Sequence, residues 1–261
     1  MTQRVPILVY HHVYPDDDVG PVESPARKAT GTIGETEFRR HLSHIAENGW
    51  TVVSTTQVVE WLAGTATLPE RSVVLHFDNG WLDARTTVMP ILREYGVTGT
   101  SYVISEGADA ATAGRPAAIR TSTEGAVQKP CFTWRQAEEL LKAGWEIGAH
   151  TATHPRLAEV LAGSGDDAVV AEIERSHEAY VENLGFVPAH FAYPSGSRDE
   201  RTDALLSPYY RSLRLWQFSS PPVWSFTEAG TSPFALDCQN IDNTVGFDDF
   251  ARIFVEALEH R

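Results

Sequence analysis

The chain has 261 residues, 42% of them hydrophobic, and a formal net charge of −14 at pH 7. This length and composition suit one large hydrophobic core, so we expect a single domain over residues 1–261. The negative charge argues against nucleic acid and anionic membrane surfaces as partners, because both are bound by clustered Lys and Arg side chains.

The N-terminal residues and the cysteines bear on the cellular compartment. Met1–Pro6 lead directly into an apolar segment, without the apolar core of a signal peptide. No apolar run approaches the roughly 20 residues that span a bilayer. Cys131 and Cys238 are too few and too far apart for a disulfide framework or a CxxC metal site. We therefore expect a cytoplasmic protein with two reduced thiols.

Strand and helix patterns alternate along the chain. Val5–Tyr10 is an uninterrupted apolar run, typical of a parallel strand covered on both faces. Apolar residues at helical spacing predict a helix from Glu35 to Asn48 that ends at Gly49. A capping box at Thr133–Gln136 predicts the start of a second helix, which ends at Gly144. After each helix, a Gly-Trp pair leads into the next strand.

The same patterns predict further strands at 50–54, 72–77, 99–104, 145–149, 189–193, 213–216 and 234–238, and further helices at 83–95 (kinked at Pro90), 166–184 and 247–259. This alternation favours the α/β class and a distorted parallel (β/α) barrel, with an open doubly wound sheet as the alternative. Two irregular stretches, Glu106–Pro130 and Phe218–Pro233, are long enough to be lids or poorly ordered segments.

Two motifs place polar side chains where predicted strands end. One strand continues into Asp78 and Asn79, after which Gly80 allows the backbone to turn. His150 and His154 follow another strand, at a spacing that lets both imidazoles share one ion. A catalytic divalent ion keeps about three protein ligands and acidifies a bound water, so the motifs together suggest a metal-assisted hydrolase. The alternatives are surface or capping histidines, and for Asp78 an N-cap.

The motifs resemble those of a known family. Phe77–Gly80 resembles the FDDG motif of polysaccharide deacetylases, the NodB-homology group or carbohydrate esterase family four. His150–His154 resembles their H-[ST]-x-x-H motif, and Phe191–Gly196 is similar to their third motif in its FAYPxG form. Tyr10–Val13 and Gly144–Gly148 also resemble the corresponding segments of family members. The resemblance implies a distorted β/α barrel that removes an acetyl group from an N-acetylated sugar, in a divergent member.

The resemblance also implies roles for individual residues. Asp78 would be the general base that takes a proton from a metal-bound water, and His150 and His154 would hold zinc or a similar divalent ion. The backbone N–H of Ser195 would help to stabilise the tetrahedral oxyanion, and Tyr193 would line the pocket. An ordinary strand-to-loop turn is the alternative for this third motif.

The chain departs from the family pattern at three places. The family's third metal ligand is an aspartate, and here Asn79 offers a neutral oxygen that should bind the metal more weakly. His76 replaces a small residue and lies on the Asp78 face of its strand, as an extra ligand, a catalytic residue that orients Asp78, or a buried polar residue. The family's last motif, Leu-x-His, supplies the general acid after a helix like 247–259, but the sequence ends at Arg261. The acid could come from His11, His12, His76 or His190, or the mechanism could run without one.

A cytoplasmic, acidic chain suits a small N-acylated metabolite, such as an amino-sugar intermediate, better than an anionic wall polymer. Trp81, Tyr193 and His11 are the predicted substrate contacts. Further aromatic residues could stack on a sugar, close a lid, pack in the core or form the contacts of a homo-oligomer: Trp216, Phe218, Trp224 and Phe226. The rival functions are a non-catalytic carbohydrate-binding relative, and an amidase or imidase that acts on non-sugar substrates.

Overall fold

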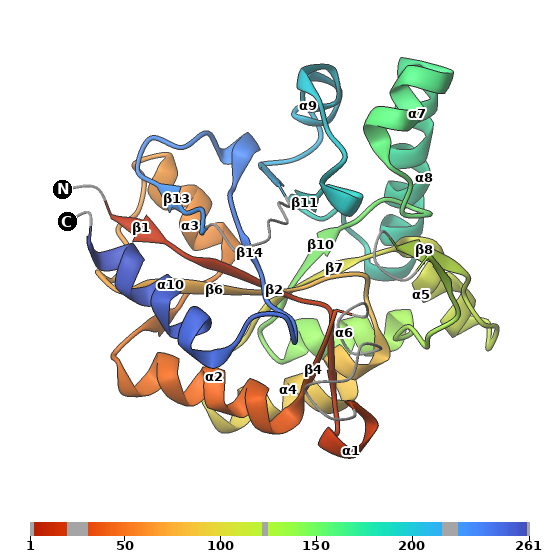
Figure 1. The fold of residues 1–261 in the computed structure, drawn as a ribbon. Helices are drawn as coiled ribbons and strands as arrows, with labels where there is room; N and C mark the ends of the chain where they lie inside the picture. Colours follow the sequence, from red (N-terminus) through yellow and green to blue (C-terminus); the bar gives the residue numbers. More distant parts are fainter. Residues whose placement is uncertain (1–2, 20–30, 122–124, 216–223, 260–261) are drawn as a thin grey trace.

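The computed structural model describes residues 3–19, 31–121, 125–215 and 224–259. A curled sheet of parallel strands runs through the molecule, and helices cover its outside (Figure 1). In spatial order the sheet contains β12 (Ser212–Arg214), β11 (His190–Ala192), β10 (Glu146–Ala149), β7 (Thr100–Val103), β6 (Ser72–Phe77), β2 (Ile7–Tyr10) and β14 (Gln239–Asn240), and β5 (Thr51–Val52) pairs with β6. Every residue of β2 and β6 is buried, as expected for strands covered on both faces.

The segment before β14 closes the sheet into a distorted barrel. Leu236 forms a parallel bridge with Arg214 of β12, and β14 pairs with β2. The N–H of Leu215 donates to the Leu236 carbonyl at 2.9 Å, and the N–H of Leu236 donates to the Leu213 carbonyl at 3.0 Å. One short segment therefore bonds to both edges of the sheet. The predicted barrel is confirmed.

The predicted strand at 234–238 is wrong in its first half. Pro233–Ala235 form the 3₁₀ turn η4, and strand-like pairing starts only at Leu236. Proline fixes its φ angle and has no N–H for a sheet, which suits the first position of a turn.

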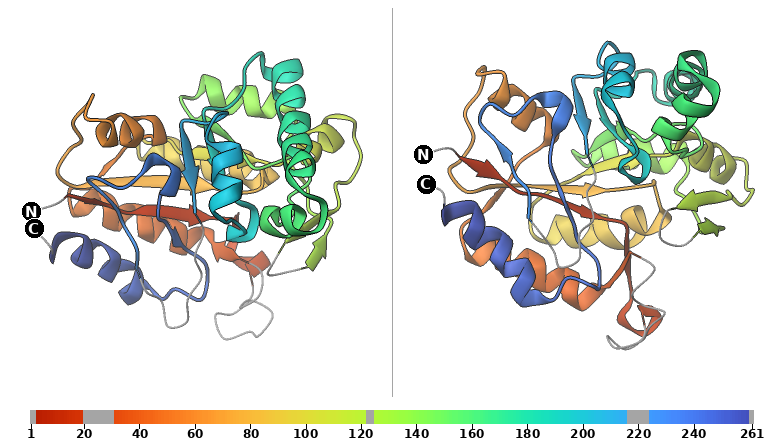
Figure 2. Two further views of the ribbon diagram at one scale, coloured as in Figure 1. Left: turned by 90° about the horizontal axis from the view of Figure 1, so that it is seen from above. Right: turned by 45° about the horizontal axis from the view of Figure 1, so that its top comes forward.

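The helices follow the strands in the chain and surround the barrel (Figure 2). They are α2 (Glu35–Glu47), α3 (Thr55–Leu62), α4 (Met89–Glu94), α5 (Ser105–Thr112), α6 (Trp134–Lys142), α7 (Leu157–Ser164), α8 (Asp166–Leu184), α9 (Glu200–Leu206) and α10 (Phe247–Glu259). The predicted capping box is present: the Thr133 side chain accepts from the Gln136 N–H, and the Gln136 side chain accepts from the Thr133 N–H. The helix predicted at 83–95 is irregular before Pro90, because a π-helical turn, η2 (Ala84–Val88), precedes α4.

The stretch Glu106–Pro130, predicted as irregular, contains regular structure. Its first part belongs to α5, and β8 (Ile119–Thr121) pairs antiparallel with β9 (Gly125–Val127). Its Ala, Gly and Thr content hid both elements, because small residues give no apolar periodicity. In the second stretch, β13 (Thr227–Glu228) pairs with β1 (Arg4–Val5), whereas Trp216 and Phe218 lie outside the described residues.

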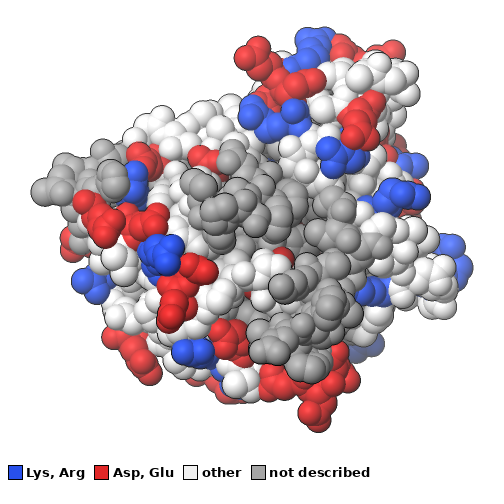
Figure 3. Space-filling model, in the orientation of Figure 1, with Lys and Arg blue, Asp and Glu red and all other residues white. Residues whose placement is uncertain are grey.

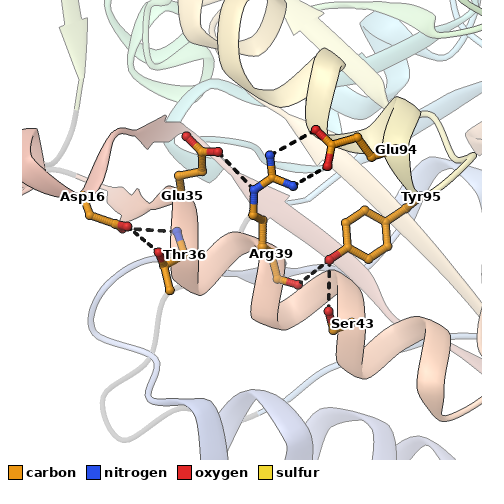
Figure 4. Close-up of polar contacts among 7 residues, drawn as sticks. All are labelled: Asp16, Glu35, Thr36, Arg39, Ser43, Glu94 and Tyr95. Carbon is orange, nitrogen blue, oxygen red and sulfur yellow. Dashed lines mark hydrogen bonds and ion pairs between the residues drawn. The ribbon is translucent and has the colours of Figure 1, made fainter.

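A half-exposed ion-pair network joins α2 to α4 on the outside of the barrel (Figure 4). Arg39 donates to Glu35 at 3.0 Å within α2 and to both oxygens of Glu94 on α4, at 2.6 and 3.1 Å. Beside it, the Tyr95 and Ser43 hydroxyls lie 3.0 Å apart. This seam holds two surface helices together and lies outside the sheet.

The remaining described elements are three or four residues long. The strands β3 (His12–Tyr14) and β4 (Thr32–Gly34) pair in parallel, the short helix α1 (Asp16–Val19) follows β3, and η3 (Pro194–Gly196) follows β11. The first described strand, β1, and the last described helix, α10, lie side by side (Figures 1 and 2). Among the described helices, none is both long and apolar enough to span a bilayer.

Candidate active site

Polar residues gather where the barrel strands end. The pairing of Tyr10 with Phe77 places His11 beside Asp78, and the Asp78 N–H donates to the Tyr10 carbonyl at 3.0 Å. His150 follows β10 and lies close enough to Asp78 to influence its charge. Active sites of parallel β/α barrels are built at this end of the strands.

Asp78 is a buried carboxylate with one engaged oxygen. Oδ2 accepts from Nη2 of Arg214 at 2.5 Å, and Oδ1 has no hydrogen-bond partner among the described residues. Burial raises the pKa of this carboxyl, but the charge of Arg214, with His150 and His11 nearby, lowers it overall to about 2. Asp78 is therefore ionised at neutral pH, and Oδ1 can accept a further hydrogen bond.

Arg214 is a site residue that the sequence analysis missed. It lies on β12 and is completely buried, with its guanidinium 5.0 Å from the centre of the Tyr102 ring. Nη1 donates to the sulfur of Cys238 at 3.5 Å. A single cation inside the apolar run Leu213–Leu215 was the available signal, because a buried arginine needs a buried acidic partner.

Asn79 has a side-chain oxygen without a partner. The side chain is buried, and Oδ1 accepts no hydrogen bond within the described part of the chain. Asn79 and Gly80 have φ angles of 75° and 74°, so the backbone turns sharply after β6. Asparagine tolerates this left-handed conformation better than most residues with a side chain. The turn holds the amide beside Asp78, where its oxygen could bind a ligand.

His150 and His154 point unoccupied nitrogens into the same region. Nδ1 of His150 donates to the Ala192 carbonyl at 2.7 Å, and Nδ1 of His154 donates to the Arg120 carbonyl at 2.8 Å. A carbonyl can only accept, so Nε2 of each ring keeps a lone pair for a metal. The ring centres are 4.8 Å apart. Burial lowers the pKa of His150 to about 3 and that of His154 to about 4, so both rings are neutral at pH 7.

Of the four histidines considered as general acid, His11 lies beside the base. It is half-buried, and its Nδ1 has no partner within the described residues. Burial lowers its pKa, and Asp78 acts in the opposite direction. The neighbouring His12 is engaged on both sides, by Asp83 at 3.2 Å and by Nζ of Lys129 at 3.1 Å.

The other two histidines lie against threonines at the start of α3. Nε2 of His76 lies 3.0 Å from the Thr55 hydroxyl, and Nε2 of His190 lies 3.0 Å from the Thr56 hydroxyl. Nδ1 of His190 also contacts Ser212 at 2.8 Å. For His76 this position favours a buried polar residue over a metal ligand, and a catalytic role stays a prediction.

The third motif forms a turn with an available backbone donor. Ser195 has a φ angle of 54°, and its N–H makes no hydrogen bond among the described residues, whereas the next N–H, of Gly196, donates to Tyr193. The Tyr193 hydroxyl donates to Asp203 on α9 at 2.7 Å. Ser195 is thus placed to offer its N–H, while the Tyr193 hydroxyl is directed to α9 and its predicted substrate contact stays a prediction.

Trp81 is buried and stacks on His12 with ring centres 5.0 Å apart. Its indole N–H has no partner in the described chain. Trp224 is half-buried, and Phe226 packs under Arg4, so the aromatic residues expected at a lid are at least partly in the core. A substrate contact of Trp81 stays a prediction.

The donor set fits a divalent ion. No group of three His, Cys, Asp or Glu side chains among the described residues could hold a metal. Two imidazole nitrogens and the unpartnered Asn79 oxygen nevertheless offer three neutral donors, and Asp78 has a free carboxylate oxygen beside them. Zinc accepts nitrogen and oxygen ligands of this kind. On the face of the molecule that Figure 3 shows, acidic and basic side chains are interspersed.

Comparison with known proteins identifies the family. The family model for polysaccharide deacetylases matches residues 65–209, which is more than half of the chain. This protein therefore belongs to the polysaccharide deacetylase family, and the predicted resemblance is confirmed.

Two relatives place the chain at low identity within larger proteins. YxkH of Bacillus subtilis (strain 168), whose name assigns it to the polysaccharide deacetylases, is 21% identical over 199 residues, which cover 76% of this chain and 59% of YxkH. The poly-β-1,6-N-acetyl-D-glucosamine N-deacetylase of Escherichia coli (strain K12) is 26% identical over 121 residues, 46% of this chain and 18% of the relative.

Solved structures confirm the fold across nearly the whole chain. The Streptococcus pyogenes deacetylase PplD, in complex with acetate, superposes with a TM-score of 0.74 at 19% identity and covers 97% of this chain and 99% of its own. The de-N-acetylase from Aggregatibacter actinomycetemcomitans gives 0.76 at 22% identity, covering 96% and 99%. IcaB from Ammonifex degensii gives 0.74 at 22% identity, covering 98% and 97%.

Proposed function

We propose that the chain is a metal-dependent deacetylase that removes an acetyl group from an N-acetylated amino sugar. The observation that carries this proposal is the grouping of unpartnered polar atoms: Oδ1 of Asp78 and Oδ1 of Asn79 lie beside the imidazoles of His150 and His154. Buried polar atoms are normally hydrogen-bonded, so a cluster without partners indicates a place for a ligand.

The residues divide the reaction among them. His150, His154 and Asn79 would hold the ion, which when bound lowers the pKa of water toward 7. Asp78, as general base, accepts the proton of the attacking water, and the Ser195 N–H stabilises the oxyanion that forms on the acetyl carbonyl. The proton taken up by Asp78 would pass through His11, the candidate acid beside it, to the leaving amine as the C–N bond breaks.

The substrate class rests on the relatives and on the pocket residues. The Escherichia coli relative is named for action on poly-β-1,6-N-acetyl-D-glucosamine. We infer that the substrate of this chain contains the same N-acetylated amino-sugar unit. We propose that the substrate is a small molecule rather than a polymer. The cytoplasmic location, the homo-oligomer and the exclusion of nucleic acid and membrane partners also stay predictions.

The experiment measures acetate release by metal-free, zinc-loaded and cobalt-loaded protein from N-acetylglucosamine and its β-1,6-linked oligomers. We expect release only with metal, and a loss of about 10²- to 10⁴-fold in Asp78→Asn. Asn79→Asp should bind metal more tightly, because it restores a negative ligand. Asp167→Asn, an exposed change on α8, is the matched control.

Two outcomes would contradict the proposal. Equal acetate release by wild type and Asp78→Asn would remove the assigned base. Failure to bind saturating zinc or cobalt, with no acetate release, would favour the non-catalytic carbohydrate-binding relative that the replacement at Asn79 suggests. Release from simple amides but not from sugars would favour the amidase or imidase.

A further inference from the structure

The loop that carries the two histidines has a strained backbone. Thr151 and His154 have φ angles of 65° and 64°, in the left-handed region that residues other than glycine seldom adopt. Such a conformation persists only when surrounding contacts hold it. Within the loop, the His154 N–H donates to the Thr151 hydroxyl at 2.9 Å.

Two neighbouring helices hold this loop from outside. At the start of α5, the N–H of Ser105 donates to the Thr151 carbonyl at 3.2 Å, and the N–H of Glu106 donates to the Ala152 carbonyl at 3.1 Å. From α8, the buried carboxylate of Glu172 accepts from both the N–H and the hydroxyl of Thr153, at 2.6 and 2.9 Å. The residue directly before His154 is thus fixed by a charged side chain.

Arg175 completes the arrangement one turn along α8. Its Nη2 donates to the second oxygen of Glu172 at 2.5 Å, and its Nη1 lies 3.2 Å from Glu106 on α5. One oxygen of Glu172 therefore accepts hydrogen bonds from the loop. The other accepts from Arg175, which also contacts α5. Hydrogen bonds to ionised groups are stronger than those between neutral groups. The bonds from Thr153 to the Glu172 carboxylate are therefore the strongest side-chain contact of the loop.

We propose that Glu172 is a positioning residue that holds the His150–His154 loop in the shape in which both imidazoles can share one ion. The inference rests on the proposed function only in naming the ion. Residues that orient metal ligands from behind change metal affinity when they are replaced. A merely structural contact between α8 and the loop would change stability and leave metal affinity unaltered.

The test compares Glu172→Ala, Glu172→Gln and Thr153→Val with Glu178→Gln, an exposed change on the same helix. Calorimetric titration of the metal-free proteins with zinc or cobalt gives affinity. Hydrogen exchange of the 150–156 segment gives loop order without any metal. We expect about 10- to 100-fold weaker metal binding in Glu172→Ala, with Glu172→Gln and Thr153→Val intermediate. The same variants should exchange faster in 150–156, and Glu178→Gln should match wild type.

The proposal is overturned if folded Glu172→Ala matches wild type in 150–156 exchange. It is also overturned if exchange speeds up while metal affinity is unchanged. Should Glu172→Ala fail to fold, Thr153→Val decides in the same way, since it removes only the hydroxyl donor. If wild type binds neither metal, the proposed function fails, and the exchange measurement alone still shows whether Glu172 orders the loop.

Discussion

Glu146 and Asp78, which lie at opposite ends of the strands that carry them, differ in how many of their carboxylate oxygens are engaged. At the N-terminal ends of the strands, Glu146 on β10 accepts from the Thr55 and Thr56 N–H groups at 2.9 and 3.2 Å and from the Thr100 hydroxyl at 3.0 Å. The Thr55 hydroxyl continues this chain to Thr100 at 2.7 Å and to His76 at 3.0 Å.

At the C-terminal ends of the strands, several buried atoms have no partner in the described chain, among them Oδ1 of Asp78, Oδ1 of Asn79 and Nδ1 of His11. Leaving a buried polar group unpaired costs about 1–3 kcal/mol. The unpartnered atoms at this end are grouped around Asp78, whereas both carboxylate oxygens of Glu146 accept hydrogen bonds. The difference can be tested by changing one charge at each end and one outside the barrel.

The largest effect should come from Arg214→Met, at the C-terminal end. Removing one partner of a buried ion pair costs about 3–5 kcal/mol, because the Asp78 carboxylate loses its compensating charge. In wild type the pKa of Asp78 is lowered to about 2. The ionised carboxylate therefore contributes stability at every pH above the ordinary pKa of an aspartate. This contribution is lost as the pH falls through about 2. In the variant, burial raises this pKa instead. Urea unfolding at pH 7 and pH 4 should therefore show a smaller difference from wild type at pH 4.

A difference between Arg214→Met and wild type that does not change with pH would contradict this electrostatic account. Adding Asp78→Asn to Arg214→Met should recover part of the stability, because the unpaired charge is removed with its partner.

A smaller effect is expected from Glu146→Gln, at the N-terminal end. The amide keeps one acceptor and leaves part of the network around Thr55 and Thr100 unsatisfied, at a cost of about 1–3 kcal/mol. Metal affinity should match wild type, because Glu146 begins β10 and His150 follows its other end. Unfolding and metal titration on the same sample check both statements. Weakened metal binding in a variant of unchanged stability would erase the distinction between the ends.

The smallest effect is expected from Arg39→Ala, in the seam of Figure 4. Arg39 is 34% exposed and Glu94 is 58% exposed, so water already screens their charges. Surface pairs of this kind contribute up to about 1 kcal/mol. Unfolding in low salt and in about 1 M NaCl should show the loss shrinking as salt rises. If Arg39→Ala lost as much free energy of unfolding as Arg214→Met, burial would not explain the difference expected between the two ion pairs.

Local patterns in the sequence predicted most of the scaffold. The bounds of β6, α8 and α10 agree with the predicted ones, because apolar periodicity and the Gly residues that end helices are local signals. The motif residues Asp78, Asn79 and His150 could also be identified from the sequence, since they lie within two residues of the end of a buried strand.

The missing parts depend on contacts between distant residues. Asp78 and Arg214 are brought together only when the barrel closes. Glu172 on α8 contacts Thr153 in the loop that precedes α7. The helix α5 was missed because its small residues give no apolar stripe. Sequence reasoning therefore identified the polar groups of the candidate site, and the structure was needed to find the residues that contact them.

The closure between β2 and β14 has a consequence for how the chain folds. Leu8 pairs with Gln239, so one edge of β2 stays unpaired until the chain has been synthesised past β14. Pairings between such distant parts of a chain slow folding, and an exposed strand edge invites association with other chains. We therefore expect production of this protein to be sensitive to truncation near β14, with aggregation rather than a stable shortened barrel as the result.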